Sequence, residues 1–237
     1  MQINGYLYDT HVHTSEGSAC GQNTGAEMAR AYQKAGYAGI VVTDHFFYGN
    51  TAADRSLPWK DWVCKGYEHA KEEGDKIGLQ VFFGWESGYH GTEFLIYGLN
   101  KEWLFEHPEI KDADVKEQYE LVHAGGGIVS HAHPFREEDY IPEIRLFPDC
   151  VDAVEGINAT HESPASTSHK NILYNEKAIA YAKEHGLPIT AGSDQHTTRM
   201  IGGGMLFDRK LSDEKDFCRA VLAGEAKAYW NGSEFYG

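Results

Sequence analysis

The stretch Tyr6-Leu-Tyr-Asp-Thr-His-Val-His13 is the first indication of the fold, because it places two histidines at the end of a short run that is typical of a β-strand. Four later apolar runs are followed in the same way by histidines or carboxylates. These polar residues are Asp44 and His45, Glu86, His131 and His133, and Asp194 and His196. In a parallel barrel the carboxyl ends of all strands open on one face, so groups placed there converge. An open sheet converges only near its switch point, so five such strand ends favour a barrel.

The segments between these strands predict helices. Thr24-Gly-Ala-Glu27 has the pattern of a capping box and predicts a helix that runs to Ala35. Further helices are expected over 57–73, closing at Gly74, and over 113–124, 172–185 and 213–222. Buried strands are expected over 39–43, 79–83, 94–97, 127–130, 151–154 and 188–191. Alternation of strands and helices predicts an α/β fold with a mostly parallel sheet, and the length suits a single domain over residues 1–237.

The composition is that of a folded globular chain. Hydrophobic residues make up 41% of the 237 residues and charged residues 24%, which excludes intrinsic disorder. The 21 Lys and Arg against 36 Asp and Glu give a net charge of -15, and such an acidic field disfavours general nucleic-acid binding. The start has no secretory signal pattern, and no stretch reaches the ~20 apolar residues of a membrane helix, so no membrane partner is expected. The four cysteines form no C-x-x-C pair and are expected to be the reduced thiols of a cytoplasmic protein.

The residues at the strand ends are of the types that bind transition metals. Histidine and carboxylate ligands without a thiolate pair suit Zn, Mn or Fe rather than Ca. Residues i and i+2 on a strand point the same way, so His11 and His13 can hold one ion together. The same spacing recurs at His131 and His133 and at Asp194 and His196. Since one ion uses three or four protein ligands, this number of candidates predicts two or three divalent ions.

Each motif also has a simpler structural explanation when it is taken alone. A single His-x-His pattern on a strand is common, and Asp194 could cap a helix. The recurrence of the pattern after five apolar strands makes a shared metal site the better interpretation. The remaining histidines, apart from His90, are expected at the surface or near helix ends.

Five stretches, in this order, resemble the motifs of the PHP (polymerase and histidinol phosphatase) family of phosphoesterases. They are Asp9-Thr-His-Val-His-Thr14, Val41-Val-Thr-Asp-His45, Gly84-Trp-Glu86, His131-Ala-His-Pro-Phe-Arg136 and Ala191-Gly-Ser-Asp-Gln-His196. The resemblance implies phosphoester hydrolysis on a distorted (β/α)7 barrel of mostly parallel strands, with a trinuclear metal site at the carboxyl ends of the strands. It also implies metal ligands at His11, His13, His45, Glu86, His133, Asp194 and His196. Since the family's His-Pro motif aligns with His133, the neighbouring His131 is expected to face the substrate or to support a ligand.

The chain departs from the family pattern at two positions. Many members carry an acid after the first motif that joins the third metal, whereas this loop reads Thr14-Ser-Glu-Gly-Ser-Ala-Cys20. Glu16 is expected to replace that acid, with Cys20 as the alternative. The family histidine that follows the glutamate is replaced by Glu93, with His90 as the alternative ligand. Because oxygen in place of nitrogen favours harder ions, the sequence predicts better activity with Mn than with Zn.

The main hypothesis is a metal-dependent phosphomonoesterase or phosphodiesterase that acts on a small phosphorylated substrate or a nucleotide. Arg136 would hold the phosphoryl oxygens, because a guanidinium matches phosphate bidentately. Asp194 or a histidine such as His196 would protonate the leaving oxygen. One alternative is a metallohydrolase that cuts an amide or ester on a similar barrel. The other is a non-catalytic, metal-binding regulatory module.

Overall fold

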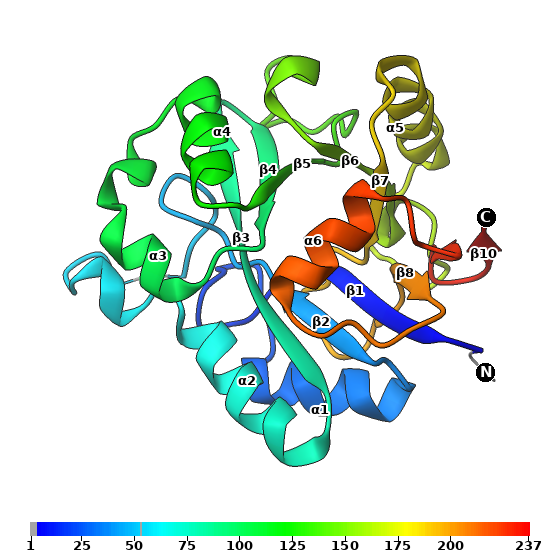
Figure 1. Cartoon of the computed structure of the whole chain (residues 1–237), viewed down its shortest axis with the longest axis horizontal. Coiled ribbons are helices and arrows are strands. Elements are labelled where there is room, and N and C mark those ends of the chain that lie inside the picture. The colour runs from blue at the N-terminus through cyan, green and yellow to red at the C-terminus, as the bar shows by residue number, and fades with distance from the viewer. Residues whose placement is uncertain (1–3, 53) are drawn as a thin grey trace.

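The apolar runs of the sequence form one continuous sheet in the computed structural model, which describes residues 4–52 and 54–237. The strands are β1 (Tyr6–Val12), β2 (Gly39–Val42), β3 (Gln80–Tyr89), β4 (Thr92–Tyr97), β5 (Ile128–Ala132), β6 (Ala153–Asn158), β7 (Ile189–Gly192), β8 (Gly204–Phe207), β9 (Ala228–Trp230) and β10 (Phe235–Tyr236). They lie in the order β10-β9-β8-β1-β2-β3-β4-β5-β6-β7, and the sheet curls round on itself (Figure 1). The sequence indicates β1 to β7, whereas β8, β9 and β10 are too short to give a clear pattern.

Helices connect the strands, most of them on the outer side of the curled sheet (Figure 1). They are α1 (Gly25–Ala35), α2 (Lys65–Ile77), α3 (Lys101–Glu106), α4 (Val115–Ala124), α5 (Ile172–His185) and α6 (Glu214–Leu222), with 3-10 turns at Trp59–Asp61, Pro108–Lys111, Pro148–Cys150 and Ala159–His161. The capping box of Thr24 and Glu27 is present, and α5 has the predicted bounds. The helix expected over 57–73 is wrong at both ends, since a 3-10 turn precedes α2 and the helix continues through Gly74. It ends instead at Gly78, whose φ of 80° is left-handed.

Strand β4 runs antiparallel to both of its neighbours, β3 and β5. The strands β1 to β3, and again β5 to β7, pair in parallel. Only His90 and Gly91 separate β3 from β4, and their φ angles of 50° and 87° make a tight hairpin with no crossover helix. The mixed α/β fold with a curled sheet is therefore confirmed. The mostly parallel sheet and the regular (β/α)7 repeat are not, because β3–β4, β4–β5, β1–β8, β8–β9 and β9–β10 all pair antiparallel.

The two sides of the curl meet at the carboxyl end of β1. Gln195, beyond β7, forms a parallel bridge with Val12, and the His13 amide donates a hydrogen bond of 2.9 Å to the Gln195 carbonyl oxygen. At its amino end, β1 pairs instead with β8, in the antiparallel direction. Helix α6 lies across the open centre of the sheet (Figure 1), and its Phe217 ring packs 5.2 Å from that of Tyr97. The sheet is thus closed on the face that carries the polar residues and plugged by α6 on the other.

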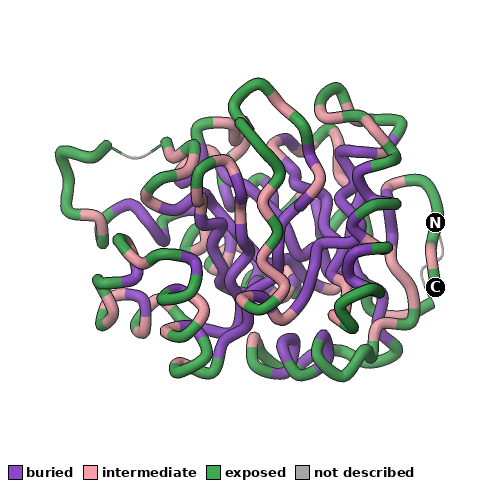
Figure 2. The backbone as a smooth tube through the Cα atoms, turned by 90° about the horizontal axis from the view of Figure 1, so that it is seen from above, coloured by how far each residue is buried: buried purple, intermediate pink, exposed green. Residues whose placement is uncertain are grey.

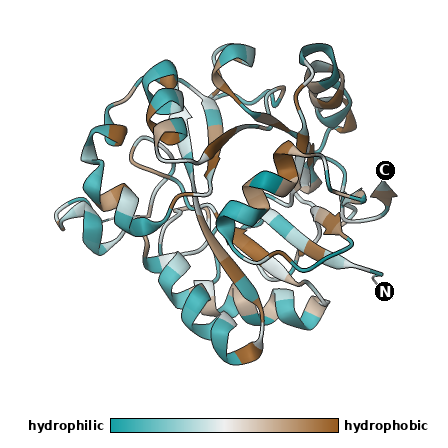
Figure 3. Cartoon of the chain, viewed as in Figure 1, coloured by the Kyte–Doolittle hydropathy of each residue, from teal (hydrophilic) through white to brown (hydrophobic). Residues whose placement is uncertain are grey.

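Burial follows this arrangement. Figure 2 shows the buried residues gathered in the central strands, with exposed residues on the outer helices and loops. Figure 3 shows the same division in hydropathy, since the strands carry most of the hydrophobic residues. Among the helices of the described residues, none combines the length and apolar character that a membrane span requires.

Candidate metal centre

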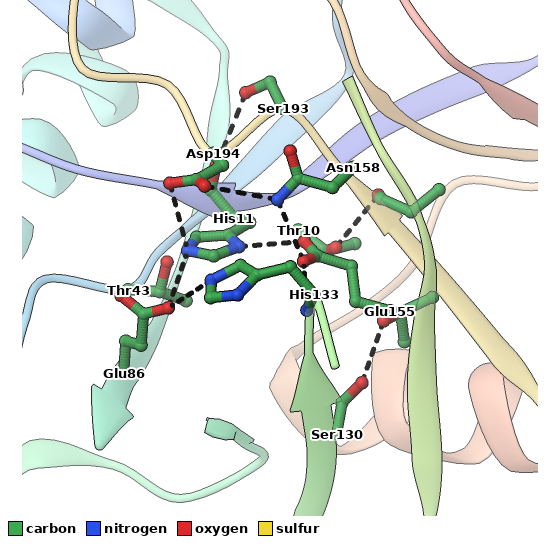
Figure 4. Close-up of polar contacts among 12 residues, drawn as sticks. Thr10, His11, Thr43, Glu86, Ser130, His133, Glu155, Asn158, Ser193 and Asp194 are labelled. Carbon is green, nitrogen blue, oxygen red and sulfur yellow. Dashed lines mark hydrogen bonds and ion pairs between the residues drawn. The ribbon is translucent and has the colours of Figure 1, made fainter. Parts of the chain in front are cut away.

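The polar residues that follow the apolar strands meet in one cluster at the closed end of the sheet (Figure 4). His11 lies in β1, Glu86 in β3 and Glu93 in β4, whereas His13, His45, His133, Asp194 and His196 lie just beyond the ends of β1, β2, β5 and β7. All of them except Glu93 and His196 are buried. Histidines and acids that are distant in the sequence thus share one site, as the strand ends predict.

The ligand atoms have the spacing of atoms that share an ion. Four groups of three residues bring such atoms within 4.8 Å of one another: His11, His13 and Glu86; His11, His133 and Asp194; His45, Glu86 and Glu93; and His13, Cys20 and His196. From Glu86 the separations are 2.9 Å to His45 Nδ1, 3.2 Å to His133 Nε2 and 3.3 Å to His11 Nε2. Two ligands at ~2.1 Å from one tetrahedral ion are ~3.4 Å apart. Glu86 belongs to two of these groups and would therefore hold metal ions together with the histidines around it.

Hydrogen bonds behind His11 and His13 determine which ring nitrogens carry protons. His11 Nδ1 lies 2.8 Å from the Glu155 carboxylate, which can only accept, so this nitrogen carries a proton. The Ser18 hydroxyl donates to Asp44 and therefore accepts from His13 Nδ1 at 3.0 Å. The two Nε2 atoms then face each other with their lone pairs across 3.1 Å. This contact requires a cation between the rings, either a proton or a metal ion.

The cluster contains buried carboxylates, whose negative charge must be neutralised by protons or metal ions. Burial alone would lower the pKa of His11, but Glu155, Asp194 and Glu86 hold it well above its usual value. Burial would raise the pKa of Glu86, but His11 and His45 hold it well below its usual value. Glu86 Oε2 and His45 Nδ1 are buried without a hydrogen-bond partner among the described residues, although each faces the other. Such a donor set fits divalent ions of the Zn, Mn or Fe kind.

Backbone turns at the strand ends aim these side chains. His133 and Asp194 have positive φ angles of 25° and 54°, a conformation that residues other than glycine rarely adopt. The His133 turn is held by its amide, which donates to Glu155 at 3.0 Å. Asp44 accepts from the amide and the hydroxyl of Thr14, each at 2.6 Å, and so fixes the loop after β1. These hydrogen bonds therefore fix the backbone from which the ligands project.

Arg136 adds a fixed cation at the wall of the site. It is only 4% exposed, and its guanidinium donates to the Asp194 carboxylate, to Thr160 at 3.4 Å and to His161 at 3.3 Å. Burial would lower the pKa of Arg136, but Asp194 raises it, so the guanidinium stays charged. His161, expected at the surface, is instead buried behind this guanidinium.

Glu93 joins the cluster, as the sequence predicts. Its carboxylate lies 3.7 Å from His45 Nδ1 and 3.6 Å from His133 Nε2. His90, the alternative ligand, is exposed in the hairpin between β3 and β4 and lines the cavity above the cluster. The structure therefore brings Glu93 to the ligand groups and leaves His90 at their rim.

Glu16 does not reach the cluster, so that prediction is wrong. Its carboxylate accepts from the Gly25 amide at 3.0 Å and lies 2.8 Å from His69 Nδ1. The first turn of α1 offers an amide and a favourable dipole to an acid, which the sequence pattern of the loop does not reveal. The alternative, Cys20, lies with His13 and His196 in one of the four ligand groups.

His131 packs away from the cavity, so the expectation that it faces the substrate is wrong. Its ring stacks on Phe94 with centroids 5.1 Å apart and meets Tyr181 edge-on at 6.3 Å. Both ring nitrogens are buried without a hydrogen-bond partner among the described residues. Burial lowers the pKa of His131 to about 3. The ring is thus a neutral part of the aromatic packing around Phe94.

Two residues of β6 support the cluster but are missed by sequence reasoning. Glu155 accepts from His11 and from the His133 amide, and Asn158 donates to Glu155 at 3.0 Å and to Asp194 at 3.2 Å (Figure 4). A signal existed, because Glu155 follows an apolar run just as Glu86 does. The run before it, over 151–154, is the weakest of the predicted strands.

A cavity of about 500 Å³ opens above the cluster. Its lining includes Arg136 and the ligand candidates His45, Glu86, Glu93, His133, Asp194 and His196, together with Tyr48, Tyr89, Tyr140, His90 and His169. A cavity of this size fits a small molecule or the end of a larger one. The metal ligands are therefore accessible to a substrate.

Known proteins share this fold. A sequence model of the PHP-associated family matches residues 173–226. A two-domain protein from Bacteroides vulgatus, containing a predicted PHP-like metal-dependent phosphoesterase, aligns over 100% of this chain and 68% of its own at 16% identity and a TM-score of 0.71. A candidate metal-dependent phosphoesterase from Bifidobacterium adolescentis aligns over 94% and 97% at 16% identity and a TM-score of 0.55. An amidohydrolase from Chromobacterium violaceum, with bound sulfate and no metal, aligns over 80% and 87% at 16% identity and a TM-score of 0.54.

No curated protein matches the chain in sequence. At 16% identity the structural likenesses show the fold alone, whereas the motifs and the match at residues 173–226 bear on the family. The five motifs lie at the strand ends and converge on one cluster. The match at residues 173–226 and the PHP-like neighbours therefore support the resemblance to the PHP-domain family that the motifs indicate.

Proposed function

We propose that this chain is a metal-dependent hydrolase of phosphoesters that acts on a small phosphorylated molecule or a nucleotide. The observation that carries the proposal is the buried Arg136 guanidinium beside a cluster of histidines and carboxylates, on the wall of one cavity. The cluster fits cations, and the guanidinium fits an anion. A phosphoryl group uses both at once.

Each residue has a role that follows from its position. Two or three divalent ions held by the cluster would activate a water molecule and neutralise charge on the phosphoryl group. Arg136 would donate to the phosphoryl oxygens, while Asp194 keeps the guanidinium in place. His196 lies 3.5 Å from Asp194 in the cavity lining, where either residue could return a proton to the leaving oxygen.

An amide or ester hydrolase is the second candidate, favoured by the likeness to the amidohydrolase from Chromobacterium violaceum. The same ligands could polarise a carbonyl oxygen, which develops a single negative charge. A single carbonyl oxygen does not require a cation that donates two parallel hydrogen bonds, so such a reaction would not explain the position of Arg136. The cavity above the cluster also argues against a purely regulatory module, because it leaves the ligands open to a substrate.

The test is a panel of phosphomonoesters, phosphodiesters, esters and amides, offered to the chain loaded in turn with Mn, Zn and Fe. We expect phosphoester hydrolysis that is lost on chelation and in Glu86→Gln. Arg136→Lys keeps the positive charge but loses the planar pair of donors that can bind two phosphoryl oxygens. Its kcat/KM for phosphoesters should therefore fall roughly tenfold or more. Hydrolysis of amides or esters with no turnover of phosphoesters would contradict the proposal.

A further inference from the structure

The Cys20 thiol lies at one edge of the metal cluster. Cys20, His13 and His196 bring ligand atoms within 4.8 Å of one another, although they come from two distant parts of the chain. Cys20 also lines the cavity, beside His45 and His196. His45 Nδ1 faces the Glu86 carboxylate at 2.9 Å, so the ring nitrogens grouped with the thiol are those of His13 and His196. The His13 Nδ1 proton is donated to Ser18, which leaves the His13 Nε2 lone pair free for an ion.

The backbone around Cys20 is held on both sides. The Ala19 amide donates to Asn50 at 2.7 Å, and the Gln22 amide donates to the His196 carbonyl oxygen at 2.7 Å. Gly21 packs so closely on Thr14 that a Cβ there would lie 2.4 Å from its carbonyl group. The backbone that carries the sulfur is thus held in place by the fold. A preformed position is what a metal ligand requires.

The ligand groups at the two edges of the cluster differ in chemistry. His45, Glu86 and Glu93 offer two carboxylates and one nitrogen. His13, Cys20 and His196 offer two nitrogens and one sulfur, which are softer ligands. Two histidines and one thiolate leave a fourth tetrahedral position open, as in catalytic zinc sites.

We propose that the Cys20 thiolate, with His13 Nε2 and His196, binds one ion of the cluster in place of the missing loop acid. Because the His13 Nδ1 proton is donated to Ser18, His13 has a single lone pair to offer, and it serves this ion. This group prefers Zn or another thiophilic ion, whereas the group with Glu93 accepts Mn. Binding releases the thiol proton to solvent as the sulfur–metal bond forms. The proposal rests on the metal-binding part of the proposed function and not on the reaction catalysed.

The test is Co²⁺ substitution of the full chain, followed by absorption spectroscopy and elemental analysis. A thiolate bound to Co²⁺ gives a near-ultraviolet charge-transfer band, which histidine and carboxylate ligands lack. We expect the band in the wild type and in Cys150→Ser, since Cys150 belongs to no ligand group among the described residues. Cys20→Ser should lose the band and about one ion per chain while it keeps the fold, as checked by circular dichroism.

Alkylation gives a second readout that does not depend on a variant. Zn should slow the reaction of Cys20 with iodoacetamide by roughly tenfold or more, because a coordinated thiolate is not free to react. Mn should slow it much less, and the labelling of Cys150 should respond to neither ion.

The outcomes separate this inference from the proposed function. Cobalt bound by the wild type without the band, or a band that survives in Cys20→Ser, would overturn the inference whatever the activity. The band without phosphoester hydrolysis would support the inference and contradict the proposed function. A chain that binds no cobalt would overturn both.

Discussion

The pattern His-x-His occurs twice at strand ends, as His11-Val-His13 and as His131-Ala-His133, with different results. In the first pair both rings face the cluster, and their Nε2 atoms lie 3.1 Å apart. In the second pair only His133 joins the ligand groups, while His131 stacks on Phe94. The same spacing therefore yields two ligands in one place and one ligand in the other.

The difference lies in the backbone. After β1 the extended pairing continues, since the His13 amide still bonds to Gln195 across the closed side of the sheet. Alternation therefore holds, and residues i and i+2 point the same way. Strand β5 ends at Ala132, and His133 turns with a φ of 25°, which sends its ring into the cavity. Spacing predicts a common face only for as long as the strand continues.

The largest effect is expected from replacing His133, the metal-ligand candidate of the second pair. His133→Ala should lose bound metal and lower activity by roughly a hundredfold or more, the scale of a catalytic ion. Elemental analysis and kcat/KM for the best phosphoester measure this. His131→Phe is the matched control and should keep both. Equal metal loss in the two variants would show that the rings do not differ as their positions indicate.

The next-largest effect is expected at the first pair, where the Glu155 carboxylate lies 2.8 Å from His11 Nδ1. Glu155→Gln removes the charge that supports this ring, so metal affinity should fall roughly 10–100-fold. Titration against a competing chelator measures it. Asp152→Asn is the control, since Asp152 makes a similar contact of 2.7 Å with His123 away from the cluster. The same loss of affinity in both variants would contradict a specific role for Glu155.

The strand ends could be predicted from the sequence because the signals there are local. Apolar runs, the Thr24 capping box and Gly186 after α5 each act within a few residues, and the structure has them where expected. What the sequence could not give is the pairing of distant segments. The antiparallel direction of β4 follows from the His90-Gly91 hairpin, which an apolar run alone does not reveal.

The same limit applies within the site. Glu16 and Glu155 are both acids near a predicted strand end, yet one caps α1 and the other supports His11. Their partners, Gly25 and His69 for one and His11 for the other, are chosen by packing between elements. Residue type and spacing indicate that a cluster forms, but tertiary contacts decide which acids belong to it.

A smaller effect concerns the stability that His131 contributes. His131→Phe removes two buried nitrogens without partners, whose burial costs about 1–3 kcal/mol, so the variant should be as stable as the wild type or more stable. Burial lowers the pKa of His131 to about 3, whereas unfolded histidine titrates near ~6.5. The unfolded state therefore binds the proton first, and the wild type loses stability as the pH falls from ~6.5 towards 3, by up to ~1.4 kcal/mol per pH unit. Denaturant unfolding of both chains in chelator at pH 7.5 and 5.0 should show the gap widening at the lower pH, and a constant gap would contradict this.

The smallest effect concerns the acid that follows the first pair. Glu16 accepts from the Gly25 amide at the start of α1 and pairs with His69, which is 46% exposed at its side chain. Glu16→Gln keeps an acceptor oxygen but loses the charge, so the free energy of unfolding should fall by only about 0.5–1 kcal/mol. Metal content should not change, because the carboxylate is directed to the helix and not to the cluster. Glu93→Gln is the matched control and should weaken metal binding, since Glu93 lies 3.6 Å from His133. Loss of an ion from Glu16→Gln would mean that this acid reaches the metals in solution. Glu16 would then compete with Cys20 as the metal ligand that the loop after β1 supplies.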